Sequence, residues 1–381
     1  MSQSRIINGL HRIYNLEFSS RLKSFEGLRS WAVIMVFNVH FFGQYYQQHY
    51  FVQAGSFAEG LIKIFQSGHI GVDLFFVLSG FLIFTTLNRN KPDFRNYIGH
   101  RSSRILPAHV IVLFVVLFPN IPWGSFLGNI LFMPSFFRSN NMFNPVTWTL
   151  GWEWLFYVLM FVIFRFKGDD NRGLYVGIVG TLVTLFVITF GFGEAFRWGE
   201  TIGNFIVPEP GRFAGFFMGV IVANLLTIDK GQALLRRVCR LMLPIAIVGV
   251  FTSQLAWSIY AGQIGESYAL RNLFYLVVSS CFSVIVAYLA TCNSGGWLNF
   301  VLQSTFMRVI GQISFSFYLI HFAIAFPLSA KMISNVDSFT SMCAHYICTF
   351  LLTIFLASLL YYYFERPYFV SKKKQPIYAN A

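Results

Sequence analysis

A succession of long apolar runs, separated by short polar segments, constrains the fold of this chain more than any other feature of its sequence. The runs lie at roughly residues 28–46, 68–87, 105–119, 146–166, 174–193, 205–227, 241–260, 271–290, 309–328 and 344–364. A helix of about 20 residues crosses the hydrocarbon core of a bilayer, where only helices and closed barrels satisfy the backbone polar groups. The sequence therefore predicts an all-α polytopic membrane protein, a bundle of about ten transmembrane helices.

The composition agrees with a membrane protein and excludes an ordinary soluble domain. Charged residues make up 11% of the chain, hydrophobic residues make up 56%, and the mean hydropathy is +0.59. A soluble domain carries about 25% charged residues. We therefore expect one transmembrane domain, residues 28–364, between a polar N-terminal segment, residues 1–27, and a basic C-terminal tail, residues 365–381.

The placement of lysine and arginine predicts the orientation of the bundle. With the N-terminus in the cytoplasm, the predicted inner segments hold all but six of the 28 lysine and arginine residues. Those six are Lys63, Arg138, Arg197, Arg212, Arg271 and Lys331. This asymmetry follows the positive-inside rule, and an even number of helices places both termini in the cytoplasm. The net charge of +13 then follows mostly from topology; it also favours contact with anionic membrane lipid, and nothing in the sequence indicates a nucleic-acid partner.

Two ionisable residues, Arg29 and His40, share one face of the first predicted helix. They are eleven positions apart, which at 100° per residue is about 20° beyond three full turns, with a rise of roughly 16 Å. An ionisable side chain inside a membrane helix is costly and is a candidate for function. The alternative is that Arg29 is only a cytoplasmic boundary charge and that His40 is a hydrogen-bonded core histidine.

A second pair of arginines precedes the third apolar run. Arg101 and Arg104 are three residues apart, so they share a face if this stretch begins a helix. Paired guanidinium groups suit bidentate binding of phosphate. Topology places Arg29 at the same cytoplasmic level, and we expect the three arginines to converge on a phosphate there. The alternative is ordinary cytoplasmic boundary charge.

Two carboxylates lie within apolar surroundings, Asp73 in HIGVDLFFVLSGFLIF and Glu153 in WTLGWEWLFY. Residue counting places both in the outer half of the bilayer, together with His40. An imidazole beside a carboxylate has a fixed tautomer and can act as a base; the alternative is a structural hydrogen bond between helices. We interpret His321, on the same helix face as Tyr318, as a hydrogen-bonding residue of the bundle. No His, Cys or Asp spacing resembles a metal site, so we expect no metal.

Six segments together resemble the membrane-bound acyltransferase family 3, whose members acylate bacterial surface polysaccharides. The segments are FEGLRSWAVIMVFNVHFF, HIGVDLFFVLSGFLIF, YIGHRSSRILP, VTWTLGWEWLFY, VIGQISFSFYLIHF and YYYFERP, and they extend from about residue 24 to residue 368. Two features depart from the family pattern: the GWEW context around Glu153 replaces a Ser-rich one, and the extracytoplasmic hydrolase-like domain of larger members is missing.

The resemblance implies roles for the candidate residues. Arg29 and His40 would be the family's spaced Arg–His pair. Arg101 and Arg104 would be the paired arginines at the acyl-CoA end. Asp73 and Glu153 fall at the family's acidic positions.

The resemblance also implies the activity, an O-acyltransferase of the bacterial inner membrane. The donor would be cytoplasmic acyl-CoA, and acetyl-CoA is favoured by the habit of the family. The acceptor would be a hydroxyl of an extracytoplasmic, lipid-linked polysaccharide such as O-antigen or exopolysaccharide. His40, oriented by Asp73 or Glu153, would deprotonate this hydroxyl. Direct transfer and a transient acyl-histidine both remain open.

Two other classes of protein also bury ionisable residues in a membrane bundle. A secondary transporter usually shows paired repeats with broken helices at the midplane, and no such repeat is visible here. A glycosyltransferase or polymerase acting on lipid-linked sugars would need an acidic extracytoplasmic loop, whereas the predicted outer loops are short and contain few acidic residues.

Overall fold

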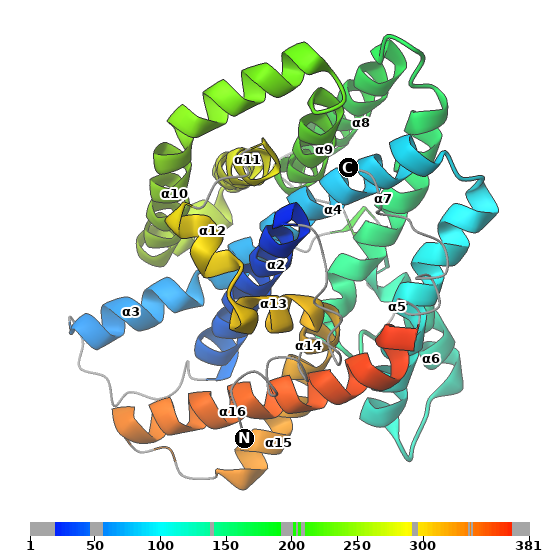
Figure 1. Cartoon of the computed structure of the whole chain (residues 1–381). Helices are drawn as coiled ribbons and strands as arrows, with labels where there is room; N and C mark the ends of the chain where they lie inside the picture. The colour runs from blue at the N-terminus through cyan, green and yellow to red at the C-terminus, as the bar shows by residue number, and fades with distance from the viewer. Residues whose placement is uncertain are drawn as a thin grey trace, which may run out of the picture.

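The computed structural model describes residues 20–45, 56–137, 141–191, 201–202, 205–206, 210–291, 296–333, 336 and 338–367. These residues form helices and short connections (Figure 1), apart from one antiparallel ladder between strands β1 (Thr201–Ile202) and β2 (Phe205–Ile206). The predicted all-α class is confirmed.

The helices follow the apolar runs of the sequence closely, although the run 309–328 is divided among α13, α14, η5 and α15. The α-helices are α2 (Ser20–Asn38), α3 (Phe57–Gln66), α4 (Gly71–Asn90), α5 (Phe94–Leu117), α6 (Trp123–Ile130), α7 (Trp148–Arg165), α8 (Arg172–Gly191), α9 (Pro210–Leu225), α10 (Asp229–Glu266), α11 (Tyr268–Thr291), α12 (Trp297–Leu302), α13 (Thr305–Gln312), α14 (Ser314–Ile320), α15 (Phe326–Met332) and α16 (Phe339–Leu360). Short 3₁₀ or π segments are η1 (Val39–Tyr45), η2 (Gly68–Ile70), η3 (Met133–Ser135), η4 (Pro145–Thr147), η5 (His321–Ala325) and η6 (Tyr361–Glu365).

Seven helical stretches among the described residues are long and apolar enough to cross a membrane. They are Phe57–Asn90, Phe94–Leu117, Pro145–Arg165, Asp229–Glu266, Tyr268–Thr291, Ser314–Met332 and Phe339–Glu365. Two shorter apolar helices, Arg172–Val187 and Pro210–Leu225, lie beside them in the sequence. A count of about ten helices and the cytoplasmic placement of both termini stay predictions.

The middle of the molecule is built on close contact between α4 and α9. A Cβ atom added to Gly80 would collide with the carbonyl oxygen of Phe216, and one added to Gly219 would collide with that of Val77. Small residues allow two backbones to approach this closely in a membrane bundle. Figure 1 shows α2 and α4 in the middle of the molecule, with α10 along one side and α16 along another.

Two helices change from α-helical to π-helical geometry, each beside a histidine. Helix α2 passes without a break into the π-helix η1, and α14 passes in the same way into the π-helix η5. His40 is the second residue of η1 and His321 is the first residue of η5. π-Helical turns are rare and occur often at functional sites. The α-helical spacing used to relate Arg29 to His40 therefore holds only as far as Asn38.

Candidate active site

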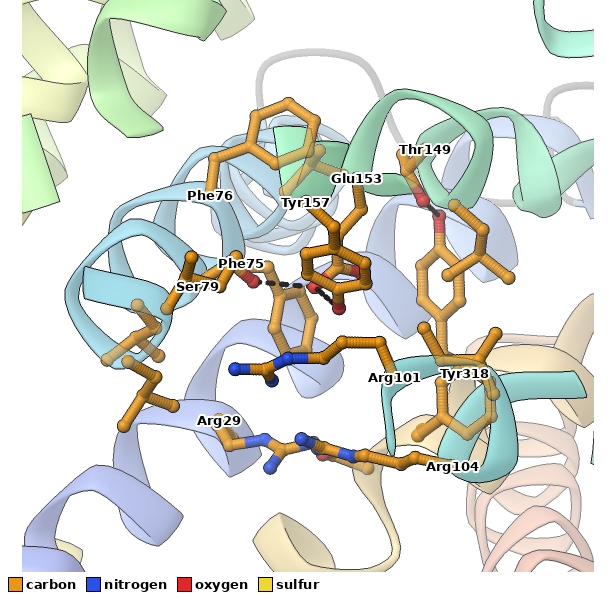
Figure 2. A pocket seen from close by; sticks show the side chains of 18 residues that line it. Arg29, Phe75, Phe76, Ser79, Arg101, Arg104, Thr149, Glu153, Tyr157 and Tyr318 are labelled. Atoms are coloured by element: carbon orange, nitrogen blue, oxygen red, sulfur yellow. Dashed lines mark hydrogen bonds between the residues drawn. The ribbon is translucent and has the colours of Figure 1, made fainter. Parts of the chain in front are cut away.

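Three arginines from two helices line one cavity, which we call the arginine cavity. Arg29 comes from α2, while Arg101 and Arg104 come from α5. Figure 2 shows Arg29 and Arg104 extending toward one another from opposite sides, with Arg101 beside them. The three arginines thus line the same cavity, and their binding of a phosphate stays a prediction. Guanidinium groups that share a cavity repel one another, and an anion such as phosphate relieves this repulsion.

Glu153 also lies in the arginine cavity. Its Oε1 atom accepts hydrogen bonds from the hydroxyl of Ser79 at 2.8 Å and from that of Tyr157 at 2.7 Å. The ring of Tyr157 in turn lies beneath Arg101, whose guanidinium carbon is 5.2 Å from the ring centroid. Glu153 was expected beside His40, but the structure places it with the arginines, because α7 turns this face toward α4 and α5.

A second cavity, which we call the histidine cavity, is lined by His40 and by residues of six further segments of the chain. Its volume is about 550 Å³, against about 90 Å³ for the arginine cavity. The polar and aromatic groups on its wall include His69, Trp148, Arg212 and Trp257. The arginine cavity is thus a narrow slot, whereas the histidine cavity is wide enough for a ring-shaped molecule.

The hydrogen-bond partner of His40 is His321. The Nδ1 atom of His40 lies 2.8 Å from Nε2 of His321, and Nδ1 of His321 lies 2.8 Å from the carbonyl oxygen of Tyr318. A carbonyl oxygen only accepts, so Nδ1 of His321 carries the proton and Nε2 of His321 accepts. His40 therefore donates through Nδ1, and its Nε2 atom keeps a lone pair. The expectation that Asp73 or Glu153 orients His40 is wrong.

Asp73 forms an ion pair with Arg212 of α9. The Oδ2 atom of Asp73 lies 3.5 Å from Nη1 of Arg212, and both side chains are buried. The guanidinium carbon of Arg212 lies 3.8 Å from the centroid of the Tyr275 ring and 5.7 Å from that of Trp148. Asp73 thus balances a buried positive charge at the edge of the histidine cavity.

Tyr318 is a wall residue that the two cavities share. Its hydroxyl donates to the carbonyl oxygen of Val146 at 2.6 Å and lies 2.9 Å from Oγ1 of Thr149. Figure 2 shows this tyrosine and Thr149 at the side of the arginine cavity away from Arg29. Val72 also lines both cavities. The arginines and His40 therefore face two spaces that meet at Tyr318.

The sequence indicated the candidate residues, but it did not predict which side chains they contact. His321 was read as a general bundle residue, although its imidazole in an apolar helix was a visible signal. Arg212 was counted only as an arginine of the outer side, yet it lies in the first turn of an aromatic-rich helix, where a buried arginine needs a counter-ion. Tyr157 lies four residues after Glu153 on α7, a spacing that places both on one helix face and that could have indicated their contact. Nothing in the sequence pairs Ser79 with Glu153, because this contact joins two different helices.

Residues 22–362 match the family described as an acyltransferase domain. Acyltransferase MdmB of Streptomyces mycarofaciens is 24% identical to this chain over 331 residues, which is 80% of this chain and 79% of MdmB. The exopolysaccharide production protein ExoZ of Rhizobium meliloti is 33% identical over 131 residues, 30% of this chain and 41% of ExoZ. YrhL of Bacillus subtilis, named as a candidate peptidoglycan O-acetyltransferase, is 25% identical over 382 residues, 90% of this chain and 54% of YrhL. No solved structure matches the chain.

Proposed function

The chain belongs to the acyltransferase domain family, and we propose that it moves an acetyl group from cytoplasmic acyl-CoA to a hydroxyl of an extracytoplasmic polysaccharide. One observation carries this proposal: an arginine cluster and a histidine with a fixed tautomer face two cavities that share one wall. Family membership makes the chain an acyltransferase and so favours this activity over transport or glycosyl transfer.

The arginine cavity is the proposed donor site. Arg29, Arg101 and Arg104 would bind the phosphates of CoA, since planar guanidinium groups match phosphate oxygens in bidentate geometry. Apolar side chains, among them Leu82 and Ile105, line much of the remaining wall. A narrow apolar slot suits the pantetheine arm, which is long and thin. The positive-inside pattern supports a cytoplasmic entrance, because it assigns all three arginines to that side.

His40 is the proposed general base. Its Nε2 lone pair would take the proton of an acceptor hydroxyl, and the oxygen would form a bond to the thioester carbonyl carbon. The carbon–sulfur bond then breaks, and the CoA thiolate receives the proton from His40. The same nitrogen is the nucleophile if an acyl-histidine forms first. In either route His321 holds His40 through Nδ1 and leaves Nε2 available.

Asp73 and Glu153, which the sequence indicated as catalytic, take supporting roles in this proposal. Asp73 would hold Arg212 at the histidine cavity. Glu153 would moderate the positive charge of the arginine cavity, where its carboxylate is already bound by two hydroxyl groups. Both carboxylates would thus modulate substrate binding, and His40 would accept and return the proton.

The proposed acceptor is a carbohydrate in the histidine cavity. The indole rings of Trp148 and Trp257 line this space, and flat aromatic faces suit the apolar faces of sugar rings. The names of ExoZ and YrhL refer to exopolysaccharide production and peptidoglycan O-acetylation. These names support a lipid-linked surface polysaccharide, such as exopolysaccharide or O-antigen, on the outer face of a bacterial inner membrane.

Sealed membrane vesicles test the proposed function and its sidedness. Inside-out vesicles given radiolabelled acetyl-CoA should incorporate label into luminal glycan, and sealed right-side-out vesicles should not until they are permeabilised. His40→Gln should lower the rate by roughly 10²-fold or more. The matched control is His109→Gln, since His109 is also buried but lines neither cavity and bonds the backbone of Asn129. Equal labelling by the two variants at equal membrane levels would contradict the role of His40, and labelling of intact right-side-out vesicles would contradict the sidedness.

A further inference from the structure

We propose that Tyr318 sets the size of the acyl group that this protein transfers, by forming the wall between the arginine cavity and the histidine cavity. This inference rests on the proposed function and adds a donor class to it, namely CoA thioesters of short acyl groups. Tyr318 touches both cavities, while Arg29, Arg101 and Arg104 line one and His40 lines the other. A thioester whose phosphates sit on the arginines would reach His40 by passing the boundary that Tyr318 and Val72 form.

Two hydrogen bonds anchor the Tyr318 side chain to Val146 of η4 and Thr149 of α7. The Tyr318 hydroxyl has a single proton, which goes to the carbonyl oxygen of Val146 at 2.6 Å. The Thr149 hydroxyl, 2.9 Å away, is therefore the donor toward the Tyr318 oxygen. The next residue of α14 is held as well, because Nδ2 of Asn144 donates to the carbonyl oxygen of Leu319 at 2.9 Å. Tyr318 itself is only 6% exposed.

The backbone of Tyr318 is fixed by the catalytic pair. Its carbonyl oxygen accepts a hydrogen bond from Nδ1 of His321 at 2.8 Å, and Nε2 of His321 accepts one from His40. Movement of α14 would therefore disturb both histidines, whereas rotation of the Tyr318 side chain would change its ring contact with His321, 5.9 Å between centroids, and keep the hydrogen bond to the Tyr318 carbonyl. The passage between the two cavities would thus open by rotation of the Tyr318 side chain. This rotation breaks the two hydrogen bonds of the hydroxyl and leaves the carbonyl contact intact.

The acyl group is the leading end of the donor, so it meets this wall before the thioester does. An acetyl group adds one methyl beyond the carbonyl, and each further methylene needs a wider opening between Tyr318, Thr149 and Val72. An extra methylene against a close-fitting apolar wall costs roughly 10-fold or more in discrimination. The closed wall also separates the thioester from water in the wider histidine cavity, which protects it from hydrolysis.

The test compares acetyl-CoA, propionyl-CoA and butyryl-CoA as donors for wild type, Tyr318→Ala, Tyr318→Phe and Thr149→Val in inside-out vesicles. Tyr318→Ala should raise the rate ratio of butyryl to acetyl transfer by about 10-fold. Tyr318→Phe and Thr149→Val keep side chains of similar volume. The first removes both hydrogen bonds of the Tyr318 hydroxyl, and the second removes the one from Thr149. They should raise acetyl-CoA hydrolysis relative to transfer. Each variant is compared at equal membrane level.

The control is Tyr175, a half-buried tyrosine of α8 that lines neither cavity. Its hydroxyl oxygen accepts a hydrogen bond from Nδ2 of Asn224 at 2.8 Å, so Tyr175→Phe and Tyr175→Ala repeat the same chemical changes elsewhere. These variants should keep the wild-type donor ranking and hydrolysis ratio.

Distinct results separate this inference from the proposed function. Wild type that transfers no acyl group from any CoA thioester contradicts the proposed function. Active wild type, with Tyr318→Ala retaining the same donor ranking, overturns the role of Tyr318 alone. Tyr318 variants that reach the membrane at normal levels but transfer nothing also overturn it, because a wall residue is not needed for the chemical step.

Discussion

The Nδ1 atom of His40 lies 2.8 Å from Nε2 of His321, although 281 positions separate the two residues in the chain. Each histidine stands where an α-helix becomes a π-helix. The contact continues from His321 to the backbone carbonyl of Tyr318, so one chain of hydrogen bonds fixes which nitrogen of His40 remains basic. In many enzymes a carboxylate has this orienting role; here a second, neutral imidazole has it.

His321→Phe should lower kcat, because His40 loses the acceptor that fixes its tautomer. A net hydrogen bond is worth about 1 kcal/mol, so we expect a loss of roughly 5- to 10-fold. The KM for acetyl-CoA should change much less than kcat, because His321 itself does not line the arginine cavity. In His321→Gln the side-chain oxygen can accept from His40, and part of the activity should return. Identical kinetics for the Phe and Gln variants would argue against an orienting role.

Arg101→Ala and Arg104→Ala should each weaken CoA binding by roughly 10- to 100-fold, as expected for one lost charge-assisted hydrogen bond. Lysine at either position should restore only part of the affinity, since an ammonium group lacks the planar fork. Thermal-shift titration with free CoA measures the affinity. The control is Arg240→Ala, which removes an exposed arginine of α10. An affinity for CoA that stays at the wild-type value in both cavity variants would falsify the assignment.

Glu153→Gln should tighten CoA binding a few-fold. The change keeps an oxygen for the hydroxyls of Ser79 and Tyr157, but it removes a negative charge that competes with phosphate for the guanidinium groups. Inhibition of acetyl transfer by free CoA at two salt concentrations gives the measurement, and the gain should shrink as salt screens the charges. Weaker inhibition by CoA would show that Glu153 supports phosphate binding in another way.

Asp73→Asn should destabilise the protein by about 3–5 kcal/mol, because it leaves the charge of Arg212 buried without its carboxylate. Adding Arg212→Gln to this variant should recover part of the loss, since no unbalanced charge then remains. Unfolding in detergent, followed by exposure of Cys239, which is buried in the folded protein, provides the readout. Additive losses in the double variant would mean that the two side chains are not coupled.

The sequence predicted where most of the helices lie and which charged residues fall within them. Apolar runs report burial in any membrane bundle, and a charge within such a run is visible without a structure. The contacts of those charges were not predictable. His40, Asp73 and Glu153 looked like one group, because residue counting along separate helices gives depth but not rotation. The structure separates them, since α4 directs Asp73 toward α9 while Glu153 faces the arginines.

The close approach of the α4 and α9 backbones at Gly80 and Gly219 has a consequence for how this protein could move. Helix α4 contributes to both cavities, through Ser79 on one and Val72 on both, and its backbone touches that of α9. A rocking motion that exposed first one cavity and then the other would have to break this contact. In the proposed function, the acyl group would pass between the two cavities while α4 and α9 stay in contact. Neither CoA nor the glycan would then have to cross the membrane.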